Sequence, residues 1–175
     1  MRISPPVAGA MWRETDPTAG AAPVVIDGHV VPPGTQVGVC AYALHHDEAY
    51  FARPFEFDPS RWLPSPSTTG AEAQEEAERL RRMTSAFMPF LLGPRGCAGK
   101  AMAYLEAGLV VAKAVWRFDF DAAPGAPGAV GEGAPGRGPL RERPGEFQLY
   151  DTFGSRHDGP HLVFRERAGA AGGRV

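Results

Sequence analysis

Hydrophobic residues recur at helical spacing over residues 100–117 and predict the longest helix of the chain. The repeating positions lie three or four residues apart, and three more apolar residues widen the stripe: Ala101, Leu105, Leu109, Ala112 and Trp116, with Met102, Val110 and Val111. Methionine and aromatic side chains on this helix indicate core packing. Residues 71–83 are strong helix formers with acids first and bases last, which suits the helix dipole. Their apolar face is poor, so an exposed helix is expected there.

Shorter apolar runs predict strands. Residues 24–31 hold two β-branched runs around Asp27-Gly28, a dipeptide that favours a two-residue hairpin turn. Residues 36–44 are typical of a buried strand, with Cys40 in the core. Residues 146–150 and 161–165 are strand-like and able to pair with each other.

The remaining segments show no periodic spacing of hydrophobic residues. Residues 1–23 are rich in Pro, Gly and Ala and are expected to be irregular, and residues 45–66 are expected to be extended coil. Residues 122–145 hold almost no large apolar side chain, which predicts a flexible Ala/Pro/Gly insert. Residues 168–175 are expected to form a disordered tail, which leaves residues 1–167 as one domain portion with the flexible insert inside it.

Composition excludes several classes of protein. The 175 residues are 43% apolar and 22% charged, as in a globular protein, although Gly 22 and Pro 18 favour long loops. A net charge of -2 gives no reason to expect nucleic acid or an anionic membrane as partner. The two cysteines form no CxxC, which argues against a zinc site or a disulfide framework. Neither a signal peptide nor an apolar run long enough for a membrane anchor is present within the chain; Ala107 to Trp116 is too short.

Two local motifs favour structural interpretations. His45-His46-Asp47 contains metal-ligand types, but adjacent residues on a strand point to opposite faces, so a solvated turn is the better interpretation. Gly99-Lys100 resembles the end of a phosphate loop, but Pro94 and Ala101 occupy positions that require Gly and Ser/Thr.

The candidate chemistry lies in residues 90–99, FLLGPRGCAG. Cys97 stands on a glycine-punctuated loop just before the predicted helix, whose free N–H groups favour a negatively charged sulfur. Gly93 and Gly99 let the backbone approach a flat group, and Arg95 can pair with a carboxylate. A haem has a flat ring, an iron that accepts a thiolate and two propionates, so this loop offers a complement to each of its parts.

The segment resembles the cytochrome P-450 haem-binding signature F-x-x-G-x-R-x-C-x-G at every fixed position. The resemblance implies that Cys97 is the axial ligand of haem b (iron protoporphyrin IX). It implies that Arg95 pairs with a propionate, and that Phe90 packs beside the sulfur. Leu91 departs from the small residue that the family more often has there.

Other segments agree with this resemblance. Residues 51–62 resemble the family's proline-phenylalanine-arginine region, although Ser60 stands where a Glu is usual. By resemblance, Arg61 belongs to a buried triad, and Arg2 is the arginine of an E-x-x-R motif whose Glu would precede Met1. Glu76-x-x-Arg79 and Glu78-x-x-Arg81 lie in the wrong order for that motif and are typical of helix pairing.

The resemblance also assigns Arg13 to a second propionate. It implies a mainly-α family fold, of which this chain is a partial, C-terminal piece of mixed α and β structure. Residues 2–14, 45–46 and 99–106 are similar to fungal microsomal members.

The implied function is that of a haem-thiolate monooxygenase, which inserts one oxygen atom from O2 into a small organic substrate. Its implied electron source is an NADPH-dependent reductase, and its implied location is the cytosolic face of the endoplasmic reticulum membrane for a full-length form. The family's oxygen-activating helix lies upstream of this segment, so no catalytic residue is assigned and the isolated chain is not expected to be competent. The alternative is a vestigial or non-catalytic haem-binding protein. A partner-binding module built on residues 24–44 has no positive support in the sequence.

Overall fold

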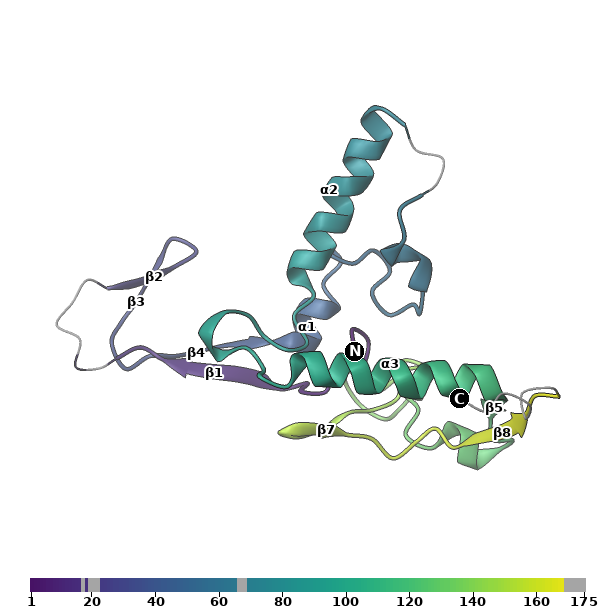
Figure 1. Ribbon diagram of the computed structural model, residues 1–175. Coiled ribbons are helices and arrows are strands. Elements are labelled where there is room, and N and C mark those ends of the chain that lie inside the picture. Colours follow the sequence, from purple (N-terminus) through teal and green to yellow (C-terminus); the bar gives the residue numbers. More distant parts are fainter. Residues whose placement is uncertain (17, 19–22, 66–68, 169–175) are drawn as a thin grey trace. The chain divides into compact units, whose positions relative to one another are not determined.

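The computed structural model of the chain describes residues 1–16, 18, 23–65 and 69–168. It divides into two compact units (Figure 1). Unit 1 comprises Met1–Pro89 with Asp151–Ser155, and unit 2 comprises Phe90–Tyr150 with the residues from Arg156 onward. Each unit is described by itself.

Unit 1 begins with a two-stranded antiparallel sheet. β1 (Ala10–Glu14) pairs with β4 (Gln36–Cys40), and Trp12 stands opposite Gly38. A Cβ on Gly38 would lie 2.8 Å from the Trp12 ring, so only glycine fits beneath the indole. The prediction that residues 1–23 are irregular is therefore wrong at β1, whose mixed sequence AMWRE carries no clear alternation.

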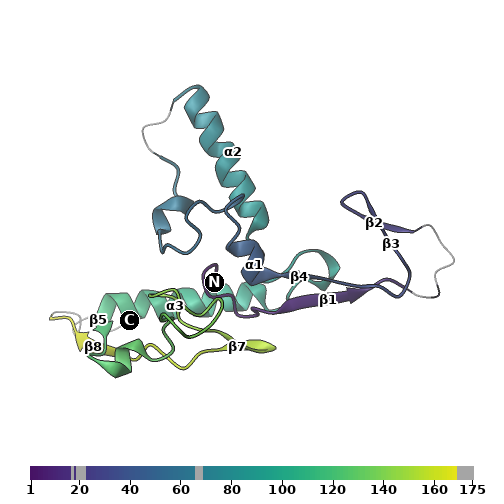
Figure 2. The same cartoon turned by 180° about the vertical axis from the view of Figure 1, so that it is seen from behind.

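The hairpin predicted over residues 24–31 is present in the structure. β2 (Val24–Ile26) and β3 (His29–Val31) pair antiparallel around Asp27 and Gly28, both of which have positive φ as a tight primed turn requires. The hairpin extends away from α1 in both views of the ribbon (Figures 1 and 2).

The strand predicted over residues 36–44 ends at Cys40, because the chain turns there into the short helix α1 (Ala41–His45). Cys40 is half-buried rather than part of the core, and its Sγ lies 3.1 Å from the Ala8 carbonyl oxygen. The expected extended coil after α1 is also interrupted, by the 3-10 turn η1 (Pro59–Trp62), where the Asp58 carboxylate accepts from the Ser60 N–H.

The core of unit 1 lies where α2 (Ala71–Ala86) meets the segment between α1 and η1. Phe51, Met83 and Ala86 are buried, and four partly buried side chains pack against them: Leu44, Trp62, Leu80 and Phe87. The rest of α2 is largely exposed, as its poor apolar face predicts, and the helix runs three residues beyond the predicted end.

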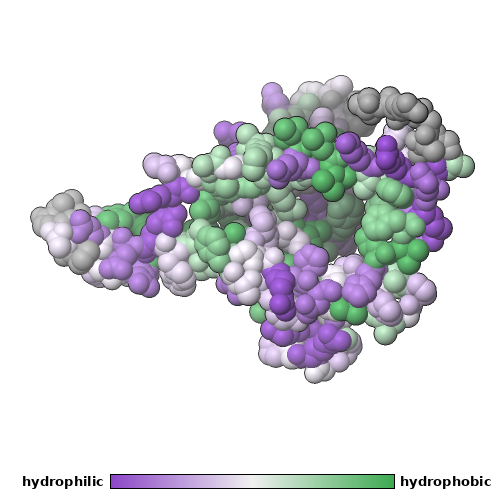
Figure 3. Space-filling model, turned by 60° about the horizontal axis from the view of Figure 1, so that its bottom comes forward, coloured by the Kyte–Doolittle hydropathy of each residue, from purple (hydrophilic) through white to green (hydrophobic). Residues whose placement is uncertain are grey.

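Unit 2 contains the long helix α3 (Lys100–Arg117), with the bounds that the hydrophobic spacing predicts. No residue of α3 is buried. Its apolar stripe therefore stays accessible, and the prediction that its methionine and aromatic residues are core packing is wrong within the described part of the chain. Hydrophobic side chains reach the surface in several places in Figure 3.

After α3 the chain forms a third antiparallel pair, β5 (Phe118–Ala122) with β8 (Leu162–Glu166). The ring of Phe164 packs against Phe118 and Phe120 across the pair. The strand near residues 161–165 is confirmed, but its predicted pairing with residues 146–150 is wrong, because β5 supplies the apolar face that β8 requires.

The segment over residues 122–145 holds the 3-10 turn η3 (Ala126–Ala129) and several backbone hydrogen bonds. One of them joins the Gly133 N–H to the Glu146 carbonyl over 2.9 Å, next to a bridge between Glu132 and Phe147. The flexibility of this segment remains a prediction. β6 (Tyr150–Thr152) and β7 (Gly154–Arg156) form a last hairpin. The predicted tail falls, from residue 169 on, outside the described residues.

Candidate functional site

The loop around Cys97 is closed by its own backbone. The Cys97 N–H donates to the Phe90 carbonyl over 2.8 Å, and the Gly96 N–H donates to the Gly93 carbonyl over 2.9 Å. Gly93 opens the 3-10 turn η2 (Gly93–Arg95) with a φ of 70°, which a glycine adopts without strain. The loop therefore returns on itself and places the cysteine beside the residue at which it began.

Cys97 leads into the N-terminus of α3. The Lys100 N–H donates to the Cys97 carbonyl over 3.3 Å, and the helix cap Gly99 provides no side-chain hydrogen bond. Cys97 is a free, exposed thiol. A Cβ built on Gly99 would lie 3.8 Å from Sγ, so the absence of a side chain there leaves space beside the sulfur.

Unit 2 thus brings together five of the six residues that the sequence assigns to the cofactor: Phe90, Gly93, Arg95, Cys97 and Gly99. Arg95 is exposed and makes no ion pair with any described residue. Phe90 is half-buried, and its ring lies 5.2 Å from the Tyr104 ring, between centroids.

Arg13, the sixth, belongs to unit 1. It lies on β1, is exposed, and donates from Nη1 to the carbonyl of its neighbour Trp12 over 2.7 Å. Its guanidinium forms no ion pair within the described ranges.

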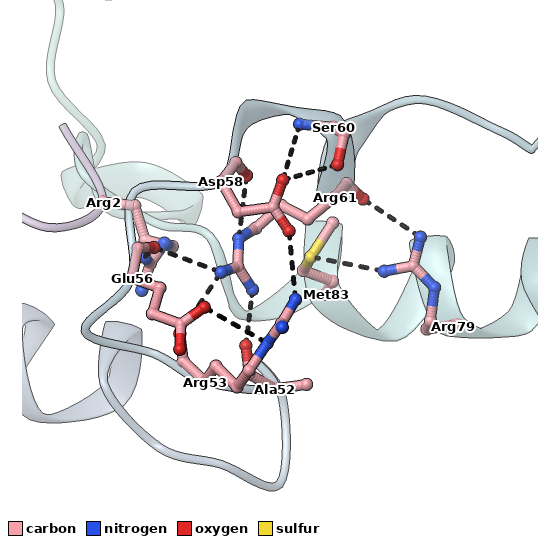
Figure 4. Close-up of polar contacts among 9 residues, drawn as sticks. All are labelled: Arg2, Ala52, Arg53, Glu56, Asp58, Ser60, Arg61, Arg79 and Met83. Carbon is pink, nitrogen blue, oxygen red and sulfur yellow. Dashed lines mark hydrogen bonds and ion pairs between the residues drawn. The ribbon is translucent and has the colours of Figure 1, made fainter.

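Two arginines are buried in unit 1 (Figure 4). Arg2 is 7% exposed and donates to the carbonyls of His45, Pro54 and Glu56 over 2.9, 2.5 and 3.2 Å. Arg61 is 8% exposed and also donates only to carbonyls, those of Ala52, Arg53, Glu56 and Asp58. Both guanidinium groups therefore share the Glu56 carbonyl, and neither has a carboxylate within ion-pair distance among the described residues.

Burial and a neighbouring positive charge disfavour the charged form of Arg2. Burial lowers the pKa of Arg2, and the neighbouring positive charge of Arg61 lowers it further. The same elements are tied to α2, because Arg79 donates to the Arg61 carbonyl over 3.0 Å while it pairs with Glu76 over 2.7 Å. This pairing within α2 agrees with the interpretation of Glu76-x-x-Arg79 as a helix pair.

His45 is a buried residue that the sequence interpretation missed. The solvated turn expected at His45-His46-Asp47 is wrong, because His45 is 0% exposed and His46 only 9%. Nε2 of His45 accepts from the Met88 N–H over 3.1 Å, and its ring lies near Phe51 and Phe87. Burial is the main cause that lowers the pKa of His45 to about 4. The aromatic residues that follow in the sequence were the available signal, since they supply the walls of this core.

Within the described ranges, no three His, Cys, Asp or Glu residues gather as they would around a metal ion. No helix in the described part of the chain combines the length and the apolarity needed to cross a bilayer.

Comparisons with known proteins identify the family of this chain. The family model described as Cytochrome P450 matches residues 1–130. The cytochrome P450 monooxygenase AKT7 of Alternaria alternata is 42% identical over 95% of the chain, and a cytochrome P450 monooxygenase of Gibberella zeae is 38% identical over 95%. The chain spans 30% and 35% of the length of these two relatives.

Solved structures show the same fold. The cyanobacterial CYP120A1 with bound retinoic acid superimposes with a TM-score of 0.64 at 22% identity, over 95% of this chain and 31% of that one. A zebrafish cytochrome P450 with abiraterone gives a TM-score of 0.58 over 95% of this chain and 30% of the other. The described residues thus form part of the P450 fold, and the match of the family model over residues 1–130 makes the chain a member of the cytochrome P450 family.

Proposed function

We propose that this chain binds haem b through the thiolate of Cys97 and serves as the haem-binding portion of a monooxygenase. The observation that carries the proposal is the loop itself. Cys97 is an exposed free thiol, its backbone is hydrogen-bonded to Phe90, and it stands one turn before the first residues of α3.

The geometry of the loop fits a flat cofactor. Gly93 and Gly99 have no side chain that would reach over the sulfur, and nothing lies within 4 Å of a Cβ built on Gly93. Free N–H groups at the start of a helix provide donors to a negatively charged group placed near them. Cys97 can therefore present its sulfur to an iron without rearrangement of the backbone around it.

Two exposed arginines are the proposed partners of the carboxylates of such a cofactor. Arg95 in unit 2 and Arg13 in unit 1 are exposed cations without an ion-pair partner among the described residues. A guanidinium binds a carboxylate through two parallel hydrogen bonds. In this proposal Arg95 holds one propionate, the family resemblance assigns Arg13 to the other, and Phe90 packs beside the sulfur.

When bound, the haem supplies the activation of dioxygen, and a thiolate ligand favours O–O cleavage. The residues of this chain contribute the ligand, its orientation and its electrostatic surroundings. The hydrogen bond from the Cys97 N–H to Phe90 fixes the backbone that carries the ligand. Arg95 and Arg13 fix the cofactor edge.

The wider reaction follows from the family. The proposed whole protein inserts one oxygen atom from O2 into a small organic substrate, with electrons from an NADPH-dependent reductase, at the cytosolic face of the endoplasmic reticulum membrane. The names of the fungal relatives as monooxygenases support this proposal.

We further propose that the chain of 175 residues alone is not a competent monooxygenase. The supporting observation is that α3, which follows the ligand loop, has no buried residue. A haem held on one face only would be open to water. Purified chain, haem, reductase and NADPH are expected to give no product from a panel of lipophilic substrates, and hydroxylated product would contradict this.

The assignment of Cys97 as the iron ligand is tested by substituting each of the two cysteines in turn. The purified chain is reconstituted with haem, reduced and exposed to CO, and the Soret band is recorded. A red-shifted band typical of thiolate ligation is expected for the native chain and for Cys40→Ser, and its loss is expected for Cys97→Ser. A native chain without that band, or a Cys97→Ser chain that retains it, would overturn the assignment. Absence of that band in the native chain would favour the vestigial alternative.

A further inference from the structure

The ring of Tyr104 rests against the residue that starts the cysteine loop. Its centroid lies 5.2 Å from that of Phe90, with the two planes 54° apart. Phe90 in turn accepts the hydrogen bond from the Cys97 N–H over 2.8 Å. Phe90 is therefore held by α3 through its side chain and holds the cysteine through its backbone.

Tyr104 projects from a fixed position. It lies in the second turn of α3, directly after Ala103, whose N–H donates to the Gly99 carbonyl over 2.9 Å. Tyr104 is 41% exposed, and its hydroxyl makes no hydrogen bond to a described residue. The ring, and not the hydroxyl, makes the contact.

The backbone next to Phe90 needs such support. Leu91 has a φ of 59°, in the left-handed region that a side chain disfavours, and Gly93 follows with 70°. A strained residue persists only where its surroundings hold it in place. The Tyr104 ring and the Cys97 hydrogen bond both act on Phe90, the residue directly before the strained position.

We infer that Tyr104 is a positioning residue for the Cys97 ligand: its ring holds Phe90, and Phe90 holds the cysteine backbone. The inference rests on the proposed function for its relevance to haem, but its geometry lies wholly in the protein. If Tyr104 only helped to form the helix, Tyr104→Leu would not weaken the loop, because leucine forms helices better than tyrosine.

The first test uses the haem-free chain with variants Tyr104→Leu and Tyr104→Phe, and Leu105→Ala as the matched control on the same helix. Hydrogen exchange of the Cys97 amide is measured. Loss of the aromatic pair in Tyr104→Leu is expected to raise the exchange rate roughly twofold to tenfold. Tyr104→Phe and Leu105→Ala are expected to keep the native rate. A native rate in Tyr104→Leu, or an equal increase in Tyr104→Phe, would overturn the inference.

The second test uses the same chains loaded with haem, reduced and exposed to CO. Tyr104→Leu is expected to show a smaller fraction of the red-shifted Soret band than the native chain, with Tyr104→Phe restoring it. If the native chain lacks the band, the proposed function fails, and the exchange rates still decide the role of Tyr104. If the native chain shows the band and Tyr104→Leu shows it in full, the inference fails alone.

Discussion

The imidazole of His45 accepts a hydrogen bond at Nε2 from the backbone N–H of Met88, over 3.1 Å. Only a neutral ring can accept there, because a protonated imidazole has donors at both nitrogens. Burial lowers the pKa of this ring, the Arg2 backbone acts in the opposite direction, and the charges of His46 and Arg2 lower it further, to about 4.

The stability of unit 1 should therefore fall in acid. Above pH 6.5, the ordinary pKa of histidine, His45 is neutral in both states and contributes no pH dependence. As the pH falls from 6.5 to about 4, only the unfolded state takes up this proton, so roughly 3 kcal/mol of unfolding free energy is lost. Below about pH 4 the folded state is protonated as well, and the loss from this group ends.

Urea unfolding at several pH values between 7 and 4 measures this loss. His45→Gln keeps a hydrogen-bond acceptor but does not titrate, so the difference between the native chain and this variant isolates the histidine. Parallel curves for the two proteins across that range would show that His45 carries no such effect.

Of the neighbouring residues Arg61 and Arg53, we expect Arg61 to contribute more to the free energy of unfolding. In Arg61→Met the carbonyl oxygens that now accept from the guanidinium stay buried without a donor, which costs about 3 kcal/mol of unfolding free energy. The Arg53 side chain is 67% exposed in its ion pairs, so Arg53→Met should change the free energy by less than about 0.5 kcal/mol. Denaturant midpoints measure both, and equal midpoints would contradict the prediction.

Two glycines should respond in opposite directions to alanine. Gly108 lies within α3 with nothing within 4 Å of an added Cβ, so Gly108→Ala should stabilise the helix by about 1 kcal/mol. Gly38→Ala forces a Cβ to 2.8 Å from the Trp12 ring and should lower the unfolding free energy by about 1–3 kcal/mol. Circular dichroism during thermal unfolding separates them, and the prediction fails if both changes have the same sign.

Haem retention should depend on Arg95 more than on an exposed arginine outside the loop. Removal of a charge-assisted hydrogen bond to a propionate in Arg95→Ala is expected to weaken retention roughly tenfold. Arg82→Ala on α2 is the matched control, since Arg82 is also exposed. Transfer of haem to an apo-globin acceptor measures the dissociation rate. Equal rates for the two variants would remove Arg95 from the proposed site.

The sequence predicts local elements better than long-range strand pairs. α3 and the β2–β3 hairpin have the predicted bounds because each follows from local information: helical spacing over residues 100–117 and a turn at Asp27-Gly28. The loop residues from Phe90 to Gly99 come together for the same reason, since all of them lie within ten positions of the chain.

Non-local partners account for the errors. β1 is a strand because β4 pairs with it from the other side of the hairpin, and β8 pairs with β5 across residues 123–161. His45 is buried because Phe51 and Phe87 enclose it, although its neighbours His46 and Asp47 are polar. No local pattern in the sequence carries the strand pairings, and the aromatic residues after His45 indicate a core without identifying Phe87 as part of it.

The accessible apolar stripe of α3 has a consequence for handling the protein. Leu105, Val110 and Trp116 are 62%, 66% and 72% exposed on one helix. Burial of this apolar surface between two molecules lowers the free energy, so association rises with protein concentration. Dilute samples and a mild detergent are therefore the conditions under which the chain should behave as single molecules, and light scattering at increasing concentration should detect the departure from them.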